Sequence, residues 1–223
     1  MTETCSAATK LWVSALLIVI IISVLTAFAY TSSNDALKNS VRQGMESTAA
    51  VMATQINASD LAGIKPGDES SPQYIAVVRQ LRTMRSLDDK IINAYILKVN
   101  PDQTATFLVD DLMIDDPAGS ARIGEVSTSP DKMEIFTALS VPTASKEPYT
   151  TKYGSFMSAY APIDDTNEGS TGNTYAVLAI DMSAADYQTA TSKGGLILVT
   201  GILSMLIALG SLFFYGMKGK GEN

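Results

Sequence analysis

Histidine is missing from this chain of 223 residues, and cysteine occurs only once, at Cys5. Without histidine the chain cannot use Ser-His-Asp or Cys-His catalysis. With a single cysteine as well, it can build neither a His/Cys zinc site nor a disulfide framework. The net charge is −7 and the chain has no basic block, so we expect no nucleic-acid partner, because such partners need Lys and Arg to neutralise phosphates. We therefore expect neither an enzyme nor a bound cofactor.

Charge is missing from two long segments, Leu11–Tyr30 and Gly194–Met217. A helix of 20 residues rises about 30 Å, which is one hydrocarbon thickness of a bilayer. Both segments are apolar on all sides rather than along one stripe, which disfavours two core helices of a soluble domain. The sequence therefore predicts transmembrane helices at 11–30 and 194–217.

Lysines at the outer ends of these segments indicate the topology. Lys10 precedes the first span, and Lys218 and Lys220 follow the second. Positive charge favours the cytoplasmic side, so we expect cytoplasmic tails at 1–10 and 218–223 and a domain at 31–193 outside the cell membrane, extracellular or periplasmic. Both tails are too short to fold, so any cytoplasmic output must come from another chain or from a part missing here.

The outer domain begins with a helical pattern over residues 31–62. Leu37, Val41, Met45, Met52 and Ile56 recur at intervals that place them on one face of a helix. This stripe packs either on its own domain or on a second copy, which would make the protein a homodimer. A second helix is expected at Gln73–Leu87, capped by Ser70 or Ser71.

After Asp88–Asp89 the hydrophobic period changes from 3.6 to 2, which is typical of strands. A short helix is expected at Ser129–Leu139, with Ser129 as its cap and Pro130 at its first position. The sequence thus predicts an α+β domain, in which a five-stranded antiparallel sheet follows a long N-terminal helix between two transmembrane helices. The expected strands are Ile91–Val99, Thr104–Asp110, Tyr149–Lys152, Gly154–Ile163 and Asn173–Met182.

Alternation divides the side chains of the last two strands between two faces. The apolar set of Ala176, Leu178, Ile180 and Met182 suits packing against the long helix. The more polar set of Tyr175, Val177, Ala179 and Asp181 is the one that we expect to face a pocket. In the preceding strand Phe156, Ser158 and Tyr160 are likewise expected on the pocket side, opposite Met157, Ala159 and Ala161.

Two stretches resemble a known family. YGSFMSAYAPI at Tyr153–Ile163, followed by YAVLAIDM at Tyr175–Met182, is similar to the last hairpin of extracellular Cache sensor domains of the PAS-like type. NAYILKVNPDQTATFLVDD, followed by IGE at Ile123–Glu125, resembles that family's first two strands and the loop after them. The likeness covers about residues 35–190. Unlike many members, this chain has Tyr153 in place of Trp, an enlarged loop at 164–169 and no cytoplasmic signalling module.

The resemblance implies a small-molecule sensor in which the sheet cups a ligand. Binding would alter the second span and, through it, a signalling partner in the membrane or cytoplasm. A membrane-tethered adaptor that binds a solute or a protein without signalling is the alternative. The ligand-binding residues carried over by position are Tyr95, Asp110, Arg122, Tyr149, Tyr153, Ser158, Tyr160 and Asp181.

The chemistry of these residues indicates an amino acid, a carboxylate or an amine as the ligand. Arg122 or Lys152 would bind a carboxylate, Asp110 or Asp181 would bind an ammonium group, and the tyrosines would form walls. A strand-end aspartate more often caps a turn, and an inward tyrosine is more often core. The acidic clusters at 110–116 and 164–169 are expected to be solvated loops rather than metal sites.

Overall fold

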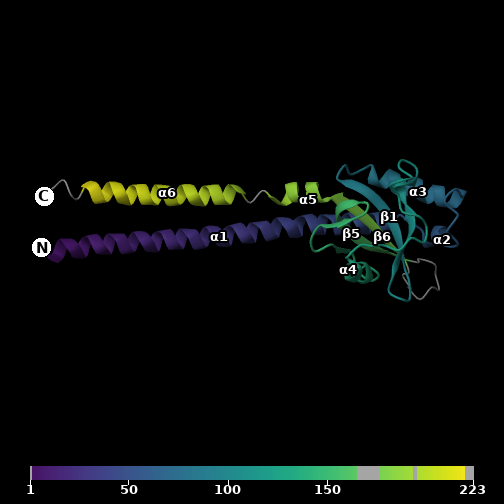
Figure 1. Ribbon diagram of the computed structural model, residues 1–223, viewed down its shortest axis with the longest axis horizontal. Coiled ribbons are helices and arrows are strands. Elements are labelled where there is room, and N and C mark those ends of the chain that lie inside the picture. Colours follow the sequence, from purple (N-terminus) through teal and green to yellow (C-terminus); the bar gives the residue numbers. More distant parts are fainter. Residues whose placement is uncertain (1, 165–175, 193–194, 219–223) are drawn as a thin grey trace. The chain divides into compact units, whose positions relative to one another are not determined.

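The computed structural model describes residues 2–164, 176–192 and 195–218. The chain forms two compact units (Figure 1). One unit comprises residues 39–189, and the other combines the segments on either side of it.

The unit formed by the chain ends consists mainly of two helices. They are the first part of α1 (Thr2–Ala53) and α6 (Gly195–Lys218). Both helices are long and apolar enough to cross a membrane, and large apolar side chains such as Trp12, Phe28, Phe213 and Phe214 are exposed on them. Apolar side chains on the outside of a helix are favourable in lipid and costly in water.

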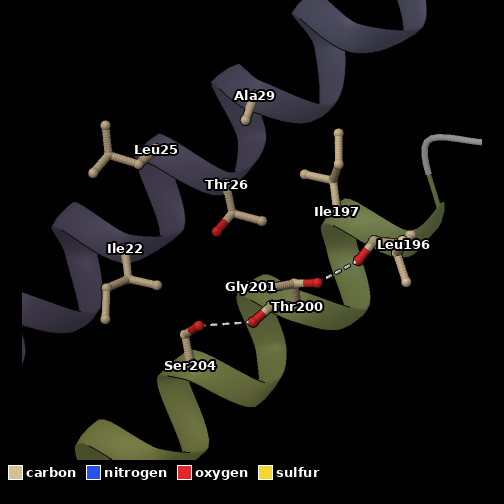
Figure 2. Close-up of a pocket in the computed structure, with 9 residues that line it drawn as sticks. All are labelled: Ile22, Leu25, Thr26, Ala29, Leu196, Ile197, Thr200, Gly201 and Ser204. Carbon is tan, nitrogen blue, oxygen red and sulfur yellow. Dashed lines mark hydrogen bonds between the residues drawn. The ribbon is translucent and has the colours of Figure 1, made fainter.

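The two helices approach closely where Gly201 of α6 faces Thr26 of α1. A Cβ atom added to Gly201 would lie 2.3 Å from Thr26 Cγ2, so only glycine fits there. Figure 2 shows the apolar hollow beside this contact, with the Thr200 and Ser204 hydroxyls donating to carbonyls of their own helix. These hydroxyls are therefore satisfied without a polar partner from outside the helix.

The other unit is built on an antiparallel sheet with the order β2-β1-β6-β5-β3, to which β4 is added by pairing with β5. The five expected strands are confirmed, and β3 is a two-residue addition that the sequence pattern did not indicate. Of the polar loop expected at 164–172, residues 165–172 lie outside the described residues, as do the first three residues of the last expected strand. The strands are β1 (Ile91–Val99), β2 (Ala105–Asp110), β3 (Thr143–Ala144), β4 (Tyr149–Thr151), β5 (Gly154–Ile163) and β6 (Ala176–Ser183).

One face of this sheet carries the main core. The expected apolar set of β6, from Ala176 to Met182, packs in one cluster with Met157, Ala159 and Ala161 of β5. The same cluster contains Met45, Ala49 and Met52 of α1, together with apolar residues of α3 (Pro72–Arg85). The division of the strand side chains between two faces is therefore confirmed.

The long helix ends at Ala53, not at residue 62 as expected. Asn57 begins a separate short helix, α2 (Ala58–Leu61), because its Oδ1 accepts a hydrogen bond from the backbone of Ser59. The expected cap of the next helix is confirmed, since Ser71 Oγ accepts from Tyr74 N at the start of α3. A side-chain cap thus sets the start of both helices.

The short helix predicted at 129–139 begins later than expected. It is α4 (Lys132–Thr137), and Ser129 accepts instead from the backbone of Asp131. Asp131 stands at the N-cap but makes no cap hydrogen bond, because its carboxylate binds two other hydroxyl groups. Two further helices were not expected, the 3-10 turn η1 (Asp111–Met113) after β2 and α5 (Ala184–Thr191) after β6.

The apolar stripe of α1 packs on its own domain. Met45, Met52 and Ile56 belong to the buried core cluster, and Val41 is partly buried against it. A dimer seam along this stripe, one of the two alternatives drawn from the sequence, is therefore wrong for these residues. Side chains that already fill the domain core are not available to a second copy.

Substitution of Met45 tests this packing. Met45 is 4% exposed, and Met45→Glu would bury an unpaired carboxyl group, so we expect the free energy of unfolding to fall by about 3 kcal/mol or more. Val51→Glu on the same helix is the control, because Val51 is 65% exposed. Thermal unfolding in detergent micelles, followed by circular dichroism, measures both variants. Equal melting temperatures would contradict the packing described here.

Candidate functional site

The second face of the sheet lines a cavity of about 170 Å³. Five of the eight residues proposed from the sequence line it, namely Tyr95, Asp110, Tyr149, Tyr153 and Asp181. The remaining wall comes from strand residues, from Leu112 and Gly119 after β2, and from the loop before α4. The structure thus gathers residues separated by up to 89 positions around one small space.

Strand register explains this gathering. Across the antiparallel sheet, Asp181 of β6 pairs with Asn93 of β1 on one side and with Ser158 of β5 on the other. In the next row Tyr95 pairs with Asp110 of β2. Directly opposite residues point to the same face with Cβ atoms about 5 Å apart, so the register alone places these polar side chains side by side.

Ser158 and Tyr160 lie beneath the cavity wall rather than on it. Both are fully buried, and both contact the Tyr149 hydroxyl, with O···O distances of 2.7 Å for Ser158 and 3.2 Å for Tyr160. Ser158 Oγ also donates to Asp181 Oδ1 at 2.5 Å. These two residues therefore hold cavity residues in place.

Two residues that the sequence pattern did not indicate, Asp131 and Ser145, complete this network. Tyr160 donates to Asp131 Oδ2 at 3.1 Å, and the Ser145 hydroxyl donates to the same oxygen. Ser145 Oγ in turn accepts from the backbone N–H of Ser158 at 3.0 Å. Neither residue lies in a strand that the sequence predicted, so no local pattern pointed to them.

Asp181 is the central charged group. Its side chain is 3% exposed, and Oδ1 accepts from Tyr95 as well as from Ser158. Burial raises the pKa of Asp181 to about 7; the two hydroxyl donors oppose this rise, and the nearby charges of Asp110 and Asp131 add to it. The carboxyl group is therefore about half protonated at neutral pH.

Asp110 has a structural role. Its two carboxylate oxygens accept from the backbone N–H groups of Leu112, at 3.0 Å, and Ala121, at 2.8 Å. Burial raises the pKa of Asp110 to about 6 in spite of these two hydrogen bonds. A strand-end aspartate that caps a turn was the ordinary alternative stated for this residue, and Asp110 does cap η1.

Arg122 is not brought to the cavity. It is exposed, and its Nη1 lies 3.7 Å from Met113 Sδ. Lys152 is paired with Glu125 at 2.9 Å and lies over the ring of Tyr153. Among the residues that the structure describes, no lysine or arginine lines the cavity, so the carboxylate-binding role proposed for Arg122 or Lys152 has no support from the geometry.

Aromatic rings form much of the wall. Tyr95 packs on Phe107 with ring centroids 5.3 Å apart, and Phe107 meets Tyr153 edge-on at 6.2 Å. Phe156 also lines the cavity and contacts Tyr149 edge-on. Gly154 lies beside Phe156 with φ of 143°, and a Cβ there would lie 2.7 Å from the Phe156 ring, which explains the glycine after Tyr153.

The acidic cluster at 110–116 was expected to be a solvated loop, and this is wrong for Asp110 and Asp111, which are buried. Arg85 of α3 donates to the buried Asp111, whose other oxygen accepts from Ala94 N at 3.1 Å, and Arg82 pairs with Asp115 at 2.7 Å. The described part of the chain holds no group of three or more acidic or cysteine residues placed to bind a metal ion. In the second acidic stretch, residues 165–169 lie outside the described residues.

Comparison with known proteins gives little further information. No family model matches the chain, and no curated protein matches it. A solved structure of the periplasmic domain of RsbU from Chlamydia trachomatis is similar over 84% of this chain, with a TM-score of 0.36 and 10% identity. The match spans 59% of the length of that structure. So distant a likeness identifies no function, which has to come from the chain's own residues.

The raised pKa of Asp181 predicts a pH-dependent stability. The folded state keeps a proton that the unfolded state loses above about pH 4, so the stabilisation is complete below that pH and is lost as pH rises through about 7. We expect the melting temperature of the empty protein to fall between pH 5 and pH 8. Asp110 contributes in the same direction.

Asp181→Asn should remove a large part of this fall, because the amide keeps an acceptor oxygen for Tyr95 and Ser158 but carries no titrating group. Asp102→Asn is the control, since it makes the same side-chain exchange at an exposed hairpin residue. Melting curves at both pH values measure the difference. Identical pH profiles for the Asp181→Asn variant and the wild type would contradict the assigned pKa.

Proposed function

We propose that this chain is a membrane-anchored sensor of Cache type whose outer domain binds a small cationic ligand. Residues 31–193 lie outside the cell membrane, and both termini lie in the cytoplasm. The observation that carries the proposal is the buried carboxyl group of Asp181 at a cavity where no described residue supplies a positive charge. The resemblance of Tyr153–Ile163 and Tyr175–Met182 to Cache sensors supports the sensor class.

The electrostatics favour a cation over an anion. Burial of a carboxylate without a counter-charge is costly, and such a group either takes up a proton or acquires a partner. Asp110 and Asp131 raise the pKa of Asp181 further, so the field within the cavity is negative. A ligand ammonium group would supply the missing charge, whereas a ligand carboxylate would add to the repulsion.

The size and walls of the cavity restrict the ligand. A volume of about 170 Å³ is below the roughly 300–1,000 Å³ of sites for drug-sized molecules. It equals the share of about six water molecules at roughly 30 Å³ each. The wall of tyrosine and phenylalanine rings suits an apolar stem and is also compatible with a cation over a ring face. We therefore propose that the ligand is a small amine, or an amino acid whose side chain is of similar size.

We assign binding rather than catalysis to this site. The most buried hydroxyl group beside Asp181 is that of Ser158, which is engaged by Asp181 and by Tyr149 beneath the wall. It is not presented to the cavity as a nucleophile. Asp110 is engaged by two backbone N–H groups, and Asp181 accepts from hydroxyl groups that are themselves part of the buried network.

Two connections link the cavity to helices at the two ends of its own unit, α1 and α5. Asp181 lies two residues before the end of β6, and α5 begins directly after that strand. On the other side, Arg42 of α1 donates to the carbonyls of Ser145, at 2.9 Å, and Ala144, at 3.2 Å. A ligand with unequal affinity for two arrangements of this network would shift their populations, and a signalling partner would read the change.

A thermal-shift screen of the full chain in detergent micelles tests the proposal. Small primary and methylated amines are compared with carboxylates of matched size, at pH 7.5. A ligand present at 100 times its Kd adds about 2.7 kcal/mol to stability, so we expect an amine to raise the melting temperature and no carboxylate to do so. The Asp181→Asn variant should show no rise in melting temperature with the amine, and the Asp102→Asn variant should show the same rise as the wild type.

Three results would count against this function. A carboxylate that stabilises the protein while no amine does would show an anion site. An amine that stabilises the wild type and the Asp181→Asn variant equally would place the ligand elsewhere. A folded protein with no hit in either class would favour the tethered adaptor with a protein partner.

A further inference from the structure

Asn93 is a cavity residue that the sequence pattern did not single out. It lies in β1 directly opposite Asp181 of β6, so the two side chains point to the same face of the sheet. Both residues line the cavity. The strand is irregular between Ile91 and Asn93, and this irregularity sets which residue of β1 stands beside Asp181.

The side-chain amide of Asn93 has no hydrogen-bond partner among the described residues. Its Oδ1 atom is buried and unsatisfied, which costs about 1–3 kcal/mol for a polar group removed from water. Rotation of the amide exchanges its oxygen and nitrogen, and neither end bonds to a described side chain or backbone group. An unsatisfied group of this kind in a folded protein requires an explanation.

Asp181 also has an unused hydrogen-bond acceptor atom, Oδ2. Both hydroxyl donors, from Tyr95 and Ser158, go to Oδ1. In the described part of the chain no donor bonds to Oδ2. Asp110, the other acidic residue of the wall, has both oxygens engaged by backbone N–H groups. The unused acceptors of the two side chains are therefore concentrated where Asn93 stands beside Asp181.

We infer that Asn93 and Asp181 together bind a primary ammonium group, with one N–H donated to each side chain. This inference rests on the proposed function and narrows its ligand class. A quaternary ammonium group can be held by aromatic rings alone, but it has no N–H and would leave the Asn93 amide unsatisfied. Selection of primary over quaternary ammonium follows from that difference, because a buried polar group left unpaired opposes binding.

Matched pairs of amines test the inference on the full chain in detergent micelles. Isothermal titration calorimetry at pH 7.5 compares a primary amine with its N-trimethyl derivative, such as ethanolamine with choline, and the best primary amine of the screen with its own derivative. We expect the primary amine of each pair that binds to have a Kd at least tenfold lower. The trimethyl group is larger and more apolar, so burial of apolar surface alone would give the opposite order.

A variant of Asn93 separates its role from that of the cavity shape. Asn93→Leu keeps the approximate size of the side chain and removes both of its hydrogen-bonding groups. We expect the affinity for the primary amine to fall at least tenfold and the affinity for the trimethyl derivative to stay the same or rise. Asn39→Leu, at an exposed position of α1, is the matched control and should leave both affinities unchanged.

Each result distinguishes this inference from the function on which it rests. Equal or tighter binding of the trimethyl compounds by the wild type would overturn the inference and leave the cationic site in place. Preference for the primary amine that persists in Asn93→Leu would overturn the role of Asn93. Failure of every amine, primary and quaternary, would instead remove the proposed function. The wild-type comparison decides the ligand class even where the Asn93→Leu variant does not fold.

Discussion

The buried carboxyl group of Asp181 is the constraint on which the cavity depends. A charge removed from water has to be neutralised or paired. Two hydroxyl groups donate to the Asp181 carboxylate, and burial raises its pKa to about 7. Asp110 and Asp131 lie near enough to raise this pKa further. In the empty domain at pH 7 a proton neutralises the group in about half of the molecules. In our proposal the ligand's own charge takes the place of that proton.

The sheet makes this arrangement rigid. Its helix side is a continuous apolar core with α1 and α3, so β1, β5 and β6 cannot slide against one another without exposing one face and burying the other. The fixed register places Asn93, Asp181 and Ser158 in one row across three strands. A second layer of bonds through Tyr149, Tyr160 and Asp131 then orients these groups from below.

The sequence predicted the parts that depend on local periodicity. The two faces of β5 and β6, the cap at Ser71 and the five main strands all follow from patterns within one element. Alternation also indicated Asp181 as an inward-facing residue, and the family resemblance indicated Tyr95, although the binding role of both remains a prediction. Alternation places Asn93 on the same face as Tyr95, but its position opposite Asp181 depends on the register between two strands. Asp131 and Ser145 lie outside the predicted strands, and their hydrogen bonds to Tyr160 and Ser158 are contacts between distant parts of the chain. The exposed position of Arg122 likewise does not follow from a local pattern.

The most direct measurement is the number of protons released when an amine binds. Calorimetric titrations of the full chain in buffers of different ionisation enthalpy give this number at each pH. With a pKa of about 7 for Asp181, we expect about half a proton released at pH 7, close to one at pH 6 and close to none at pH 8. Binding without proton release at pH 6 would contradict the replacement of the Asp181 proton by the charge of the ligand.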